Sequence, residues 1–425
     1  MVTERVRGDV RRVTLAVAAA GVCSFALLYA PQPVLPQLAE QYGLDPGRAS
    51  LAVSVATAAL AIAVLPIAVL SEIVGRRPVI IASVLASAVL GLLLPLAPSF
   101  EVLLVLRAVQ GVAIAGFPAV AAAYLVERLG RGGVAAAVGA MVAGNTVGGM
   151  LGRLASGGTA GLFGWRGALA AVAVLAFVCA VLTVVTVPAA GPAAPGGRAP
   201  LRGILGGFGL ALRKPVLLAQ YAVALLAMGS FVALYNAAGF RLTGDPLGLS
   251  PAVASLVFLA YAMGSVSSVV AGRLVGRFGR RRSLLCGLAI TAAGTALTLP
   301  DSLPLVIAGF VVLTGGFFAT HAVANGWAAA EAPPQARGPA GGLYTQAYYL
   351  GSSVGGTLGS VVYGHAGWGW LVVTVTGWLL VAFLGSLAVR APSAAAHSGS
   401  EQPAADRDDR GAQPLVVPQR PRHLP

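Results

Sequence analysis

The sequence predicts an all-α polytopic membrane protein with twelve transmembrane helices, arranged as two parallel six-helix halves. Of its 425 residues, 57% are hydrophobic and 10% are charged, and the mean hydropathy is +0.84. Soluble domains carry about 25% charged residues. Apolar runs long enough to cross a bilayer core recur along the chain, and short motifs of its first half return in its second half. These observations together predict the fold class.

Twelve apolar stretches are predicted to form the spanning helices. They cover residues 13–35, 50–71, 78–97, 102–125, 134–157, 166–188, 215–239, 250–272, 283–299, 304–329, 342–364 and 368–390. The predicted organisation is an N-terminal tail at 1–12, a first half at 13–188, a connector at 189–214, a second half at 215–390 and a disordered tail at 391–425. Pro31, Pro33 and Pro36 are expected to break or kink the first helix.

The basic residues distinguish the two sides of the predicted membrane. Segments on the side of the termini hold 23 of the 28 Lys and Arg residues, whereas the opposite loops hold only Arg48, Arg166 and Arg241. Because positive charge stays on the cytoplasmic side, both termini are predicted to be cytoplasmic, in a multi-pass protein of the cytoplasmic (inner) membrane. The net charge of +14 is then a topology signal, and nucleic acid is not expected as a partner.

Three pairs of motifs show that the chain contains an internal repeat. GNTVGGMLG from Gly144 matches GSSVGGTLG from Gly351, and FALLYA at 25–30 matches FVALYN at 231–236. VGRR and FGRR place Gly75 opposite Gly279. Because an even number of spans separates each pair, the halves are predicted to be homologous and to share one orientation in the membrane.

The turn after the second span of each half resembles the G-x-x-x-D-R-x-G-R-R/K signature of the major facilitator superfamily. The first half reads AVLSEIVGRR at 68–77, with a glutamate in place of the aspartate. The second half reads GRLVGRFGRR at 272–281, with glycine at the acidic position. The resemblance covers residues 10 to 390. It implies a secondary transporter whose two halves rock about a central binding site.

The same resemblance implies that these turns form a cytoplasmic gate. Glycine lets the chain turn tightly, and arginines can pair with an acid between the halves in one transport state and release it in the other. For the arginines alone, a role as topology anchors stays open. The predicted gate residues are Glu72, Gly75, Arg76, Arg77, Arg277, Gly279, Arg280 and Arg281.

Two stripes of glycine are predicted to let helices pack closely. Glycines four residues apart share one helix face, and small residues there allow two backbones to approach in lipid. In related transporters the spans that carry these stripes lie between the halves, so the resemblance implies that this contact forms at the interface between the halves. The first stripe also resembles the exporter-associated G-x-x-x-G-P-x-x-G-G pattern and implies export. The packing glycines are Gly144, Gly148, Gly149, Gly152, Gly351, Gly355, Gly356 and Gly359.

Two arginines fall inside predicted spans, where a charge is costly unless it is paired. Arg107, in RAVQG, resembles a family arginine tied to proton coupling, and a structural arginine bonded to backbone carbonyls is the alternative. Arg153 has Ser360 as its equivalent in the second half, so the charge belongs to one half only. We expect Arg153 and Asn145 to face a central cavity, unless Arg153 snorkels to the outer surface.

The sequence offers several candidates for the proton carrier and for the substrate contacts. Many proton-coupled relatives have an acid in span one, whereas here that span offers the polar residues Ser24, Tyr29 and Gln32. His321 titrates in a useful range, although a single histidine is often only a packed residue. Candidates for protonation are Glu101, His321 and Glu331, and cavity candidates include Tyr221, Tyr235, Asn236, Tyr261, Asn325, Gln346 and Tyr348.

The most specific function that the sequence supports is transport of a small organic molecule by alternating access, as proton-coupled efflux. Alternatives are a uniporter or importer of a sugar, amino acid or organic acid, and a non-transporting membrane receptor. No nucleotide-binding loop is present, and no cofactor, metal or enzymatic activity is expected. The expected partners are a small-molecule substrate, protons and the lipid bilayer, with a monomeric chain. Cys23, Cys179 and Cys286 are expected to be small buried hydrophobes.

Overall fold

The computed structural model describes residues 2–188 and 201–388, and every regular element in these two ranges is a helix. Part of the predicted connector, residues 189–200, and the predicted disordered tail at 391–425 lie outside the described residues. Helix α1 begins at Val2, so helical structure extends into the predicted N-terminal tail.

The first half contains five α-helices and two short 3₁₀ helices. These are α1 (Val2–Tyr29), η1 (Gln32–Val34), α2 (Leu35–Tyr42), α3 (Pro46–Val74), α4 (Arg76–Leu93), η2 (Leu94–Leu96) and α5 (Phe100–Thr186). The predicted break after the first span is confirmed, because α1 ends at Tyr29 and a 3₁₀ turn follows Pro31. Proline has no backbone N–H to continue the helical ladder.

The second half has a similar succession of helices after a short helix in the connector. Its elements are α6 (Leu201–Leu212), α7 (Pro215–Thr243), α8 (Pro251–Ser255), η3 (Leu256–Ala262), α9 (Met263–Phe278), α10 (Arg280–Leu297), α11 (Leu303–Glu331), η4 (Pro334–Ala336), α12 (Arg337–Leu350), η5 (Gly351–Gly355, a π-helical turn) and α13 (Gly356–Ala388).

Nine helical stretches of the described chain are long and apolar enough to cross a membrane. Two of them, Ala136–Thr186 with 51 residues and Pro334–Ala388 with 55, are each long enough for two crossings of about 20 residues. Each contains a glycine with positive φ, Gly164 at 63° and Gly367 at 80°, where the chain turns. Helix α10 is not among the nine, and it packs against α11 and α13. All twelve predicted spans therefore have helical counterparts, and the predicted fold class is confirmed.

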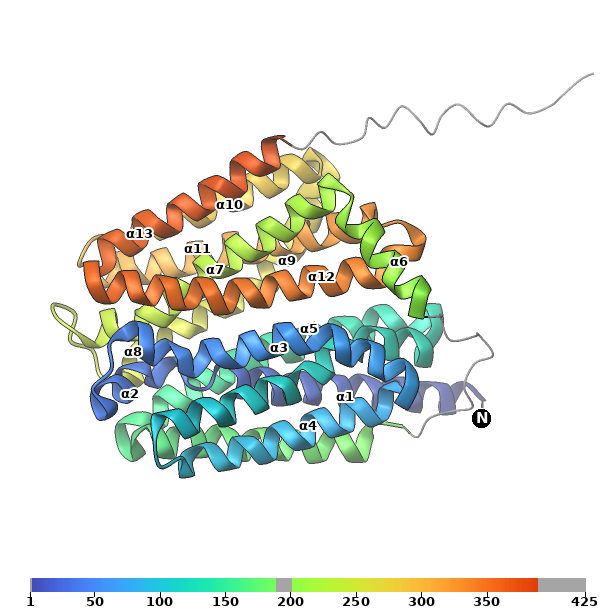
Figure 1. Cartoon of the computed structure of the whole chain (residues 1–425), viewed down its shortest axis with the longest axis horizontal. Helices are drawn as coiled ribbons and strands as arrows, with labels where there is room; N and C mark the ends of the chain where they lie inside the picture. Colours follow the sequence, from blue (N-terminus) through green and yellow to red (C-terminus); the bar gives the residue numbers. More distant parts are fainter. Residues whose placement is uncertain (1, 189–200, 389–425) are drawn as a thin grey trace, which may run out of the picture. The chain divides into compact units, whose positions relative to one another are not determined.

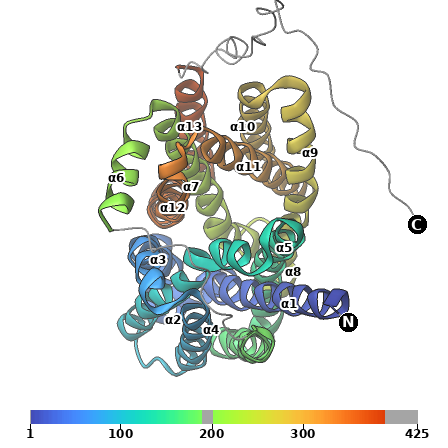
Figure 2. The same ribbon diagram turned by 90° about the vertical axis from the view of Figure 1, so that its right-hand side faces the viewer.

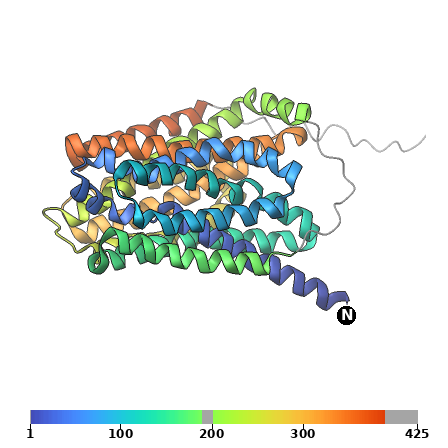
Figure 3. The ribbon, with the colours of Figure 1, turned by 60° about the horizontal axis from the view of Figure 1, so that its bottom comes forward.

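The helices of residues 2–388 form two groups that correspond to the two halves (Figures 1 and 2). The N-terminus and α6 lie at one end of these groups, and α2 and α8 lie at the other (Figure 1). Figure 3 shows the beginning of α1 extending from the first of these ends. We call it the arginine-rich end, because the turns at Arg76 and Arg280 also lie there, and we call the other the opposite end.

Two helices of the first half, α3 and α5, make most of the contact between the halves. Helix α3 packs along α12, η5 and α13, whereas α5 packs against α8 and η3 and meets α9 at only a few residues. A Cβ at Gly157 of α5 would overlap the side chain of Ser255 in α8, which shows how closely these helices approach. The chain runs from the opposite end through α8 and η3 into α9. The contact of α5 with the second half is therefore concentrated toward the opposite end.

The outer faces of the bundle carry many exposed apolar side chains. Ile62, Val105 and Val185 are 67%, 63% and 72% exposed, as expected where helices meet lipid tails rather than water. The cysteines are only partly as expected: Cys23 is buried and Cys179 is half-buried, but Cys286 is exposed. The expectation of a buried Cys286 is wrong, because it lies on the outward face of α10.

Candidate functional site

The glycine stripes join helices within each half. A Cβ at Gly148 would lie 2.5 Å from the Cα of Val22, and one at Gly152 would lie 2.6 Å from the Cα of Ala26, both in α1. Gly144 approaches the backbone of Ala18 in the same way. The α5 stripe therefore packs on α1, so close packing by these glycines is observed, but its expected place between the halves is wrong.

The second stripe repeats this arrangement against α7. Gly351 lies against the backbone of Leu225, Gly355 against Gly229 and Gly359 against Ala233. The contacted residues of α7, like those of α1, are spaced by four, so one helix face meets another along its length. Two further predicted glycines have other neighbours: the carbonyl of Gly149 accepts a hydrogen bond from Arg153, and Gly356 lies beside Asn236.

Gly75 and Gly279 form equivalent turns at the arginine-rich end. Their φ angles are 91° and 80°, a conformation that residues with a Cβ rarely adopt. Each ends one helix and begins the next, α3 to α4 and α9 to α10. The glycines of both signature turns are thus required by backbone geometry.

The arginine after each glycine forms an ion pair with a glutamate of another helix of the same half. Arg76 pairs with Glu127 of α5 and, at 2.6 Å, with Glu72 of α3. Arg280 pairs with Glu331 of α11 at 3.3 Å. Both pairs join residues 51 positions apart, so the internal repeat extends to them. The sequence reasoning missed Glu127. The repeat could have found it, because Gly75 and Gly279 are 204 residues apart, and the residue 204 positions before Glu331 is Glu127.

Each of these ion pairs joins residues of the same half. The expectation that Glu72 and the signature arginines pair between the halves is therefore wrong for this structure. The reason is that α4 packs on α5, and α10 on α11, within one half. The remaining arginines make different contacts. The guanidinium carbon of Arg277 lies 5.2 Å from the ring centre of Phe278, and Arg281 donates to the carbonyl of Leu387. The Nε of Arg77 is buried and has no hydrogen-bond partner among the described residues.

We expect the double change Glu72→Gln and Glu127→Gln to cost at most about 1 kcal/mol of unfolding free energy, because partly exposed ion pairs contribute little. Transport turnover should fall, since Arg76 then has neither acid, whereas each single change leaves it one. The measurements are thermal unfolding and flux in proteoliposomes. Glu331→Gln, which removes the partner of Arg280, is the matched variant in the second half. Turnover equal to wild type in the double variant would leave this turn as a topology anchor only.

Arg107 is fully buried and bonded mainly to backbone carbonyls. Its guanidinium donates to the carbonyl oxygens of Ala52 at 2.7 Å, Leu27 at 3.0 Å and Leu28 at 2.6 Å. It also donates to Gln110 at 2.5 Å. The helical partner of the Leu27 oxygen would be residue 31, which is a proline without an N–H. Arg107 therefore caps the C-terminus of α1, where a cation is also favoured by the helix dipole.

Arg153 is the second buried arginine, with 1% of its surface exposed, so the alternative of snorkelling to the outer surface is wrong. Its Nε donates to Oε1 of Gln32 at 2.5 Å, and its Nη1 donates to the carbonyl of Gly149 at 2.7 Å. Nε2 of Gln32 donates in turn to Oδ1 of Asn236 at 2.7 Å. Three predicted residues thus form one hydrogen-bonded chain from α5 through η1 to α7, and it crosses between the halves.

Aromatic rings surround the guanidinium of Arg153. It lies 4.3 Å from the ring centre of Tyr29, 4.4 Å from that of Tyr261 and 5.4 Å from that of Phe258. Tyr235 packs edge-on against Tyr261 at 5.1 Å and donates to, or accepts from, Thr314. The rings of this cluster in the second half are Phe231, Tyr235, Phe258, Tyr261, Phe310, Phe317 and Phe318.

The other predicted site residues lie apart from this chain. Glu101 is exposed in the first turn of α5, and Asn325 is exposed on α11. Asn145 packs its Oδ1 against Gly21 of α1 rather than beside Arg153, which corrects its expected place in the cavity. His321 accepts from, or donates to, the hydroxyl of Tyr344 at 3.0 Å, and its ring stacks on that of Phe317 and packs at a tilt against that of Tyr348.

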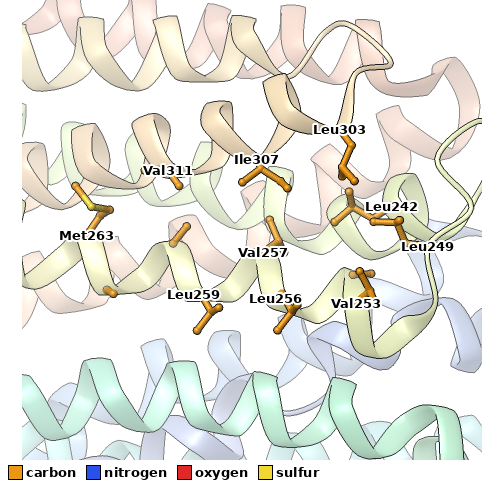
Figure 4. Close-up of a pocket in the computed structure, with 13 residues that line it drawn as sticks. Leu242, Leu249, Val253, Leu256, Val257, Leu259, Met263, Leu303, Ile307 and Val311 are labelled. Carbon is orange, nitrogen blue, oxygen red and sulfur yellow. The ribbon is translucent and has the colours of Figure 1, made fainter.

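A cavity of about 410 Å³ lies in the second half, between η3–α9 and α11 (Figure 4). Its lining is apolar, and several of its side chains are among the exposed hydrophobics, such as Leu256 and Ile307 at 53% and 48%. Such a groove suits lipid tails, and it does not include the buried polar chain. The buried polar chain at Arg153 is therefore the candidate functional site.

Comparison with known proteins identifies the family. Residues 17–245 and 242–422 match the family model described as Major Facilitator Superfamily, which accounts for nearly the whole chain. This protein belongs to the major facilitator superfamily. It is therefore a multi-pass membrane transporter of the MFS type, as the sequence resemblance predicted.

Curated relatives agree with this assignment. The chain is 39% identical over 373 residues to the inner membrane transport protein YnfM of Escherichia coli (strain K12), covering 88% of this chain and 89% of that protein. It is 36% identical over 376 residues to the uncharacterised MFS-type transporter YybF of Bacillus subtilis (strain 168), covering 88% and 92%.

Solved structures agree on the fold. A bacterial homologue of the human lysosomal transporter Spinster, in an inward-facing and unoccupied conformation, superposes with a TM-score of 0.75 at 19% identity. The match covers 89% of this MFS transporter and 97% of that chain.

Proposed function

We propose that this MFS transporter is a monomeric secondary carrier that exports a small organic molecule across the cytoplasmic (inner) membrane by alternating access, driven by proton entry. The observation that carries the proposal is the buried chain from Arg153 through Gln32 to Asn236, which links the two halves. Ionisable and polar groups inside a membrane-spanning bundle are costly to bury, and in such proteins they mark substrate or ion pathways. The printed name of the E. coli relative, an inner membrane transport protein, supports the membrane assignment.

The packing of the halves supports alternating access. Helix α5 is held against α8 and η3 but has little contact with α9, so this side of the interface is closed toward the opposite end and looser toward the arginine-rich end. With the arginine-rich end cytoplasmic, as the positive-inside rule predicts, the interface beside α5 is looser on the cytoplasmic side, whereas α3 stays packed along α12 and α13. Rocking of the halves would then reverse which end is closed.

Export and proton coupling rest on two features. The stripe at Gly144, Gly148 and Gly152 resembles the exporter-associated pattern. His321 is a titratable side chain within the span of α11, and it contacts Tyr344, Tyr348 and Phe317 of the same half. We propose His321 as the proton carrier, because its imidazole is a titratable group that is hydrogen-bonded to a second protonatable side chain, the hydroxyl of Tyr344.

Purified protein reconstituted in proteoliposomes tests the proposal. We expect an imposed pH gradient, acidic on the side equivalent to the cell exterior, to drive substrate toward that side. His321→Gln should retain counterflow exchange of substrate but lose the response to the gradient. Tyr363→Phe, on a different helix, is the matched control and should keep both. Flux that ignores the pH gradient in wild type would identify a uniporter or exchanger, and no flux of any compound would contradict transport altogether.

A further inference from the structure

We propose that the end of the buried chain at Asn236, beside Ser54 and Gly356, binds the carboxylate of the substrate, which is a small organic acid with a flat apolar body. Naming the ligand a substrate rests on the proposed transport function, but the site itself does not. The proposal follows from the direction of the hydrogen bonds, from two unpartnered polar atoms and from the charge of Arg153.

The hydrogen bonds of this chain all run in one direction. The cation Arg153 donates to the oxygen of Gln32, and the nitrogen of Gln32 donates to the oxygen of Asn236. The chain therefore ends on the amide nitrogen of Asn236, which is buried and has no hydrogen-bond partner among the described residues. Hydrogen bonds in series polarise one another, so this terminal N–H is a strengthened donor that requires an acceptor.

A second polar atom converges on the same point. The hydroxyl of Ser54, in α3, is also buried and without a partner in the described ranges. A Cβ at Gly356 would lie 2.8 Å from a methyl carbon of Val232, 3.0 Å from Nδ2 of Asn236 and 3.6 Å from Oγ of Ser54. Two donors, one from each half, therefore border the same small space beside Gly356, and an oxygen that enters it requires the Val232 side chain to shift. A buried donor without an acceptor is costly, so an oxygen bound there would stabilise the bound state.

Charge indicates that this oxygen is anionic. The ion pairs of the described chain involve Arg76, Arg241 and Arg280 near the helix ends, and none of them includes Arg153. Arg107, the other buried arginine, differs because backbone carbonyls at a helix C-terminus accept three of its hydrogen bonds. Arg153 makes only one bond to a carbonyl. A carboxylate bound at Asn236 would supply a negative charge at the other end of the hydrogen-bonded chain that begins at Arg153.

The surroundings favour a flat apolar body on the acid. Rings of Tyr29, Tyr261 and Phe258 surround the guanidinium, and Tyr235 packs against Tyr261 and Phe258. Aromatic side chains pack favourably on other rings as well as on cations. The unpartnered donor at the Asn236 end of the chain and the ring cluster at its Arg153 end together predict aromatic or similarly flat monocarboxylates.

Matched acids and amides test the inference on the purified full-length protein in detergent. The probes are benzoate and benzamide, phenylacetate and phenylacetamide, and benzylamine as a cation, each at millimolar concentration. We expect at least one acid to raise the unfolding midpoint by binding the native state, with an affinity at least about 10-fold above its amide. Benzylamine should have no effect.

Two isosteric variants separate binding from folding. Gln32→Glu places an internal carboxylate on Arg153, and Asn236→Asp replaces the terminal donor by a charged acceptor. Both should fold, because each keeps the size of the side chain and gains a charge near Arg153, yet each should weaken acid binding by about 10- to 100-fold. Arg241→Gln is the control, since Arg241 also stacks on an aromatic ring, Trp368, but pairs with Asp301; it should bind acid as wild type does.

The outcomes distinguish this inference from the proposed function. The inference is wrong if no acid stabilises wild type, if an amide or benzylamine binds equally well, or if acid binding survives both variants. Acid binding without flux in proteoliposomes would support the site and reject transport. Flux of a neutral or cationic compound without acid binding would support transport and reject the site.

Discussion

Gly148→Val should prevent the first half from folding. Its Cβ would lie 2.5 Å from the Cα and 2.7 Å from the carbonyl oxygen of Val22, and helix backbone cannot yield as a flexible side chain can. The helices α1 and α5 would have to separate along the stripe, and in lipid close packing is the main source of their attraction. We expect a loss of more than about 3 kcal/mol, seen as aggregated or absent protein in fluorescence-detected size-exclusion chromatography.

Gly139→Val is the matched control on the same helix. Nothing lies within 4 Å of a Cβ at Gly139, so this change should leave the elution profile and the unfolding midpoint nearly unchanged. Gly355→Val tests the second half, where the Cβ would meet the backbone of Gly229, and it should fail as Gly148→Val does. A monodisperse Gly148→Val protein with the wild-type unfolding midpoint would contradict the observed packing of α5 on α1.

The sequence was sufficient to predict the helices, because each depends on local signals. Apolar length located the spans, Pro31 marked the end of α1, and glycine before a pair of arginines marked the sharp turns at Gly75 and Gly279. The repeat predicted that whatever forms in one half has an equivalent in the other. The pair of Arg280 with Glu331 and that of Arg76 with Glu127 obey this rule.

The partners of those residues were harder to predict, since they depend on which helices are neighbours. A stripe of glycine shows that some helix packs closely against it, but not which one. The sequence therefore could not identify α1 and α7 as the partners, rather than helices of the other half. The same limit applies to polar residues. Gln32, Arg153 and Asn236 were each predicted individually, and only the folded chain shows that they bond to one another, while Asn145 on the helix of Arg153 does not join them.

Arg107→Met should destabilise the protein before it affects any proton coupling. Methionine fills a similar volume but leaves the carbonyl oxygens that Arg107 serves without their charged donor, among them that of Leu27, whose helical partner is Pro31. The expected loss is about 3 kcal/mol, and thermal unfolding of the detergent-solubilised protein measures it. Arg166→Met is the control, because Arg166 donates to one carbonyl, that of Ala97, and its loss should cost less than about 1 kcal/mol.

Arg107→Lys separates the two roles that the sequence allows for this arginine. Lysine keeps the charge but not the planar fork that reaches Ala52, Leu27 and Leu28 from one position. A structural cap therefore predicts a midpoint between those of wild type and Arg107→Met, with the response of flux to the pH gradient retained in the protein that folds. If Arg107 instead carried the coupling, Arg107→Met would unfold at the wild-type temperature and transport without responding to the gradient. The four hydrogen bonds around Arg107, three of them to backbone, favour the first result.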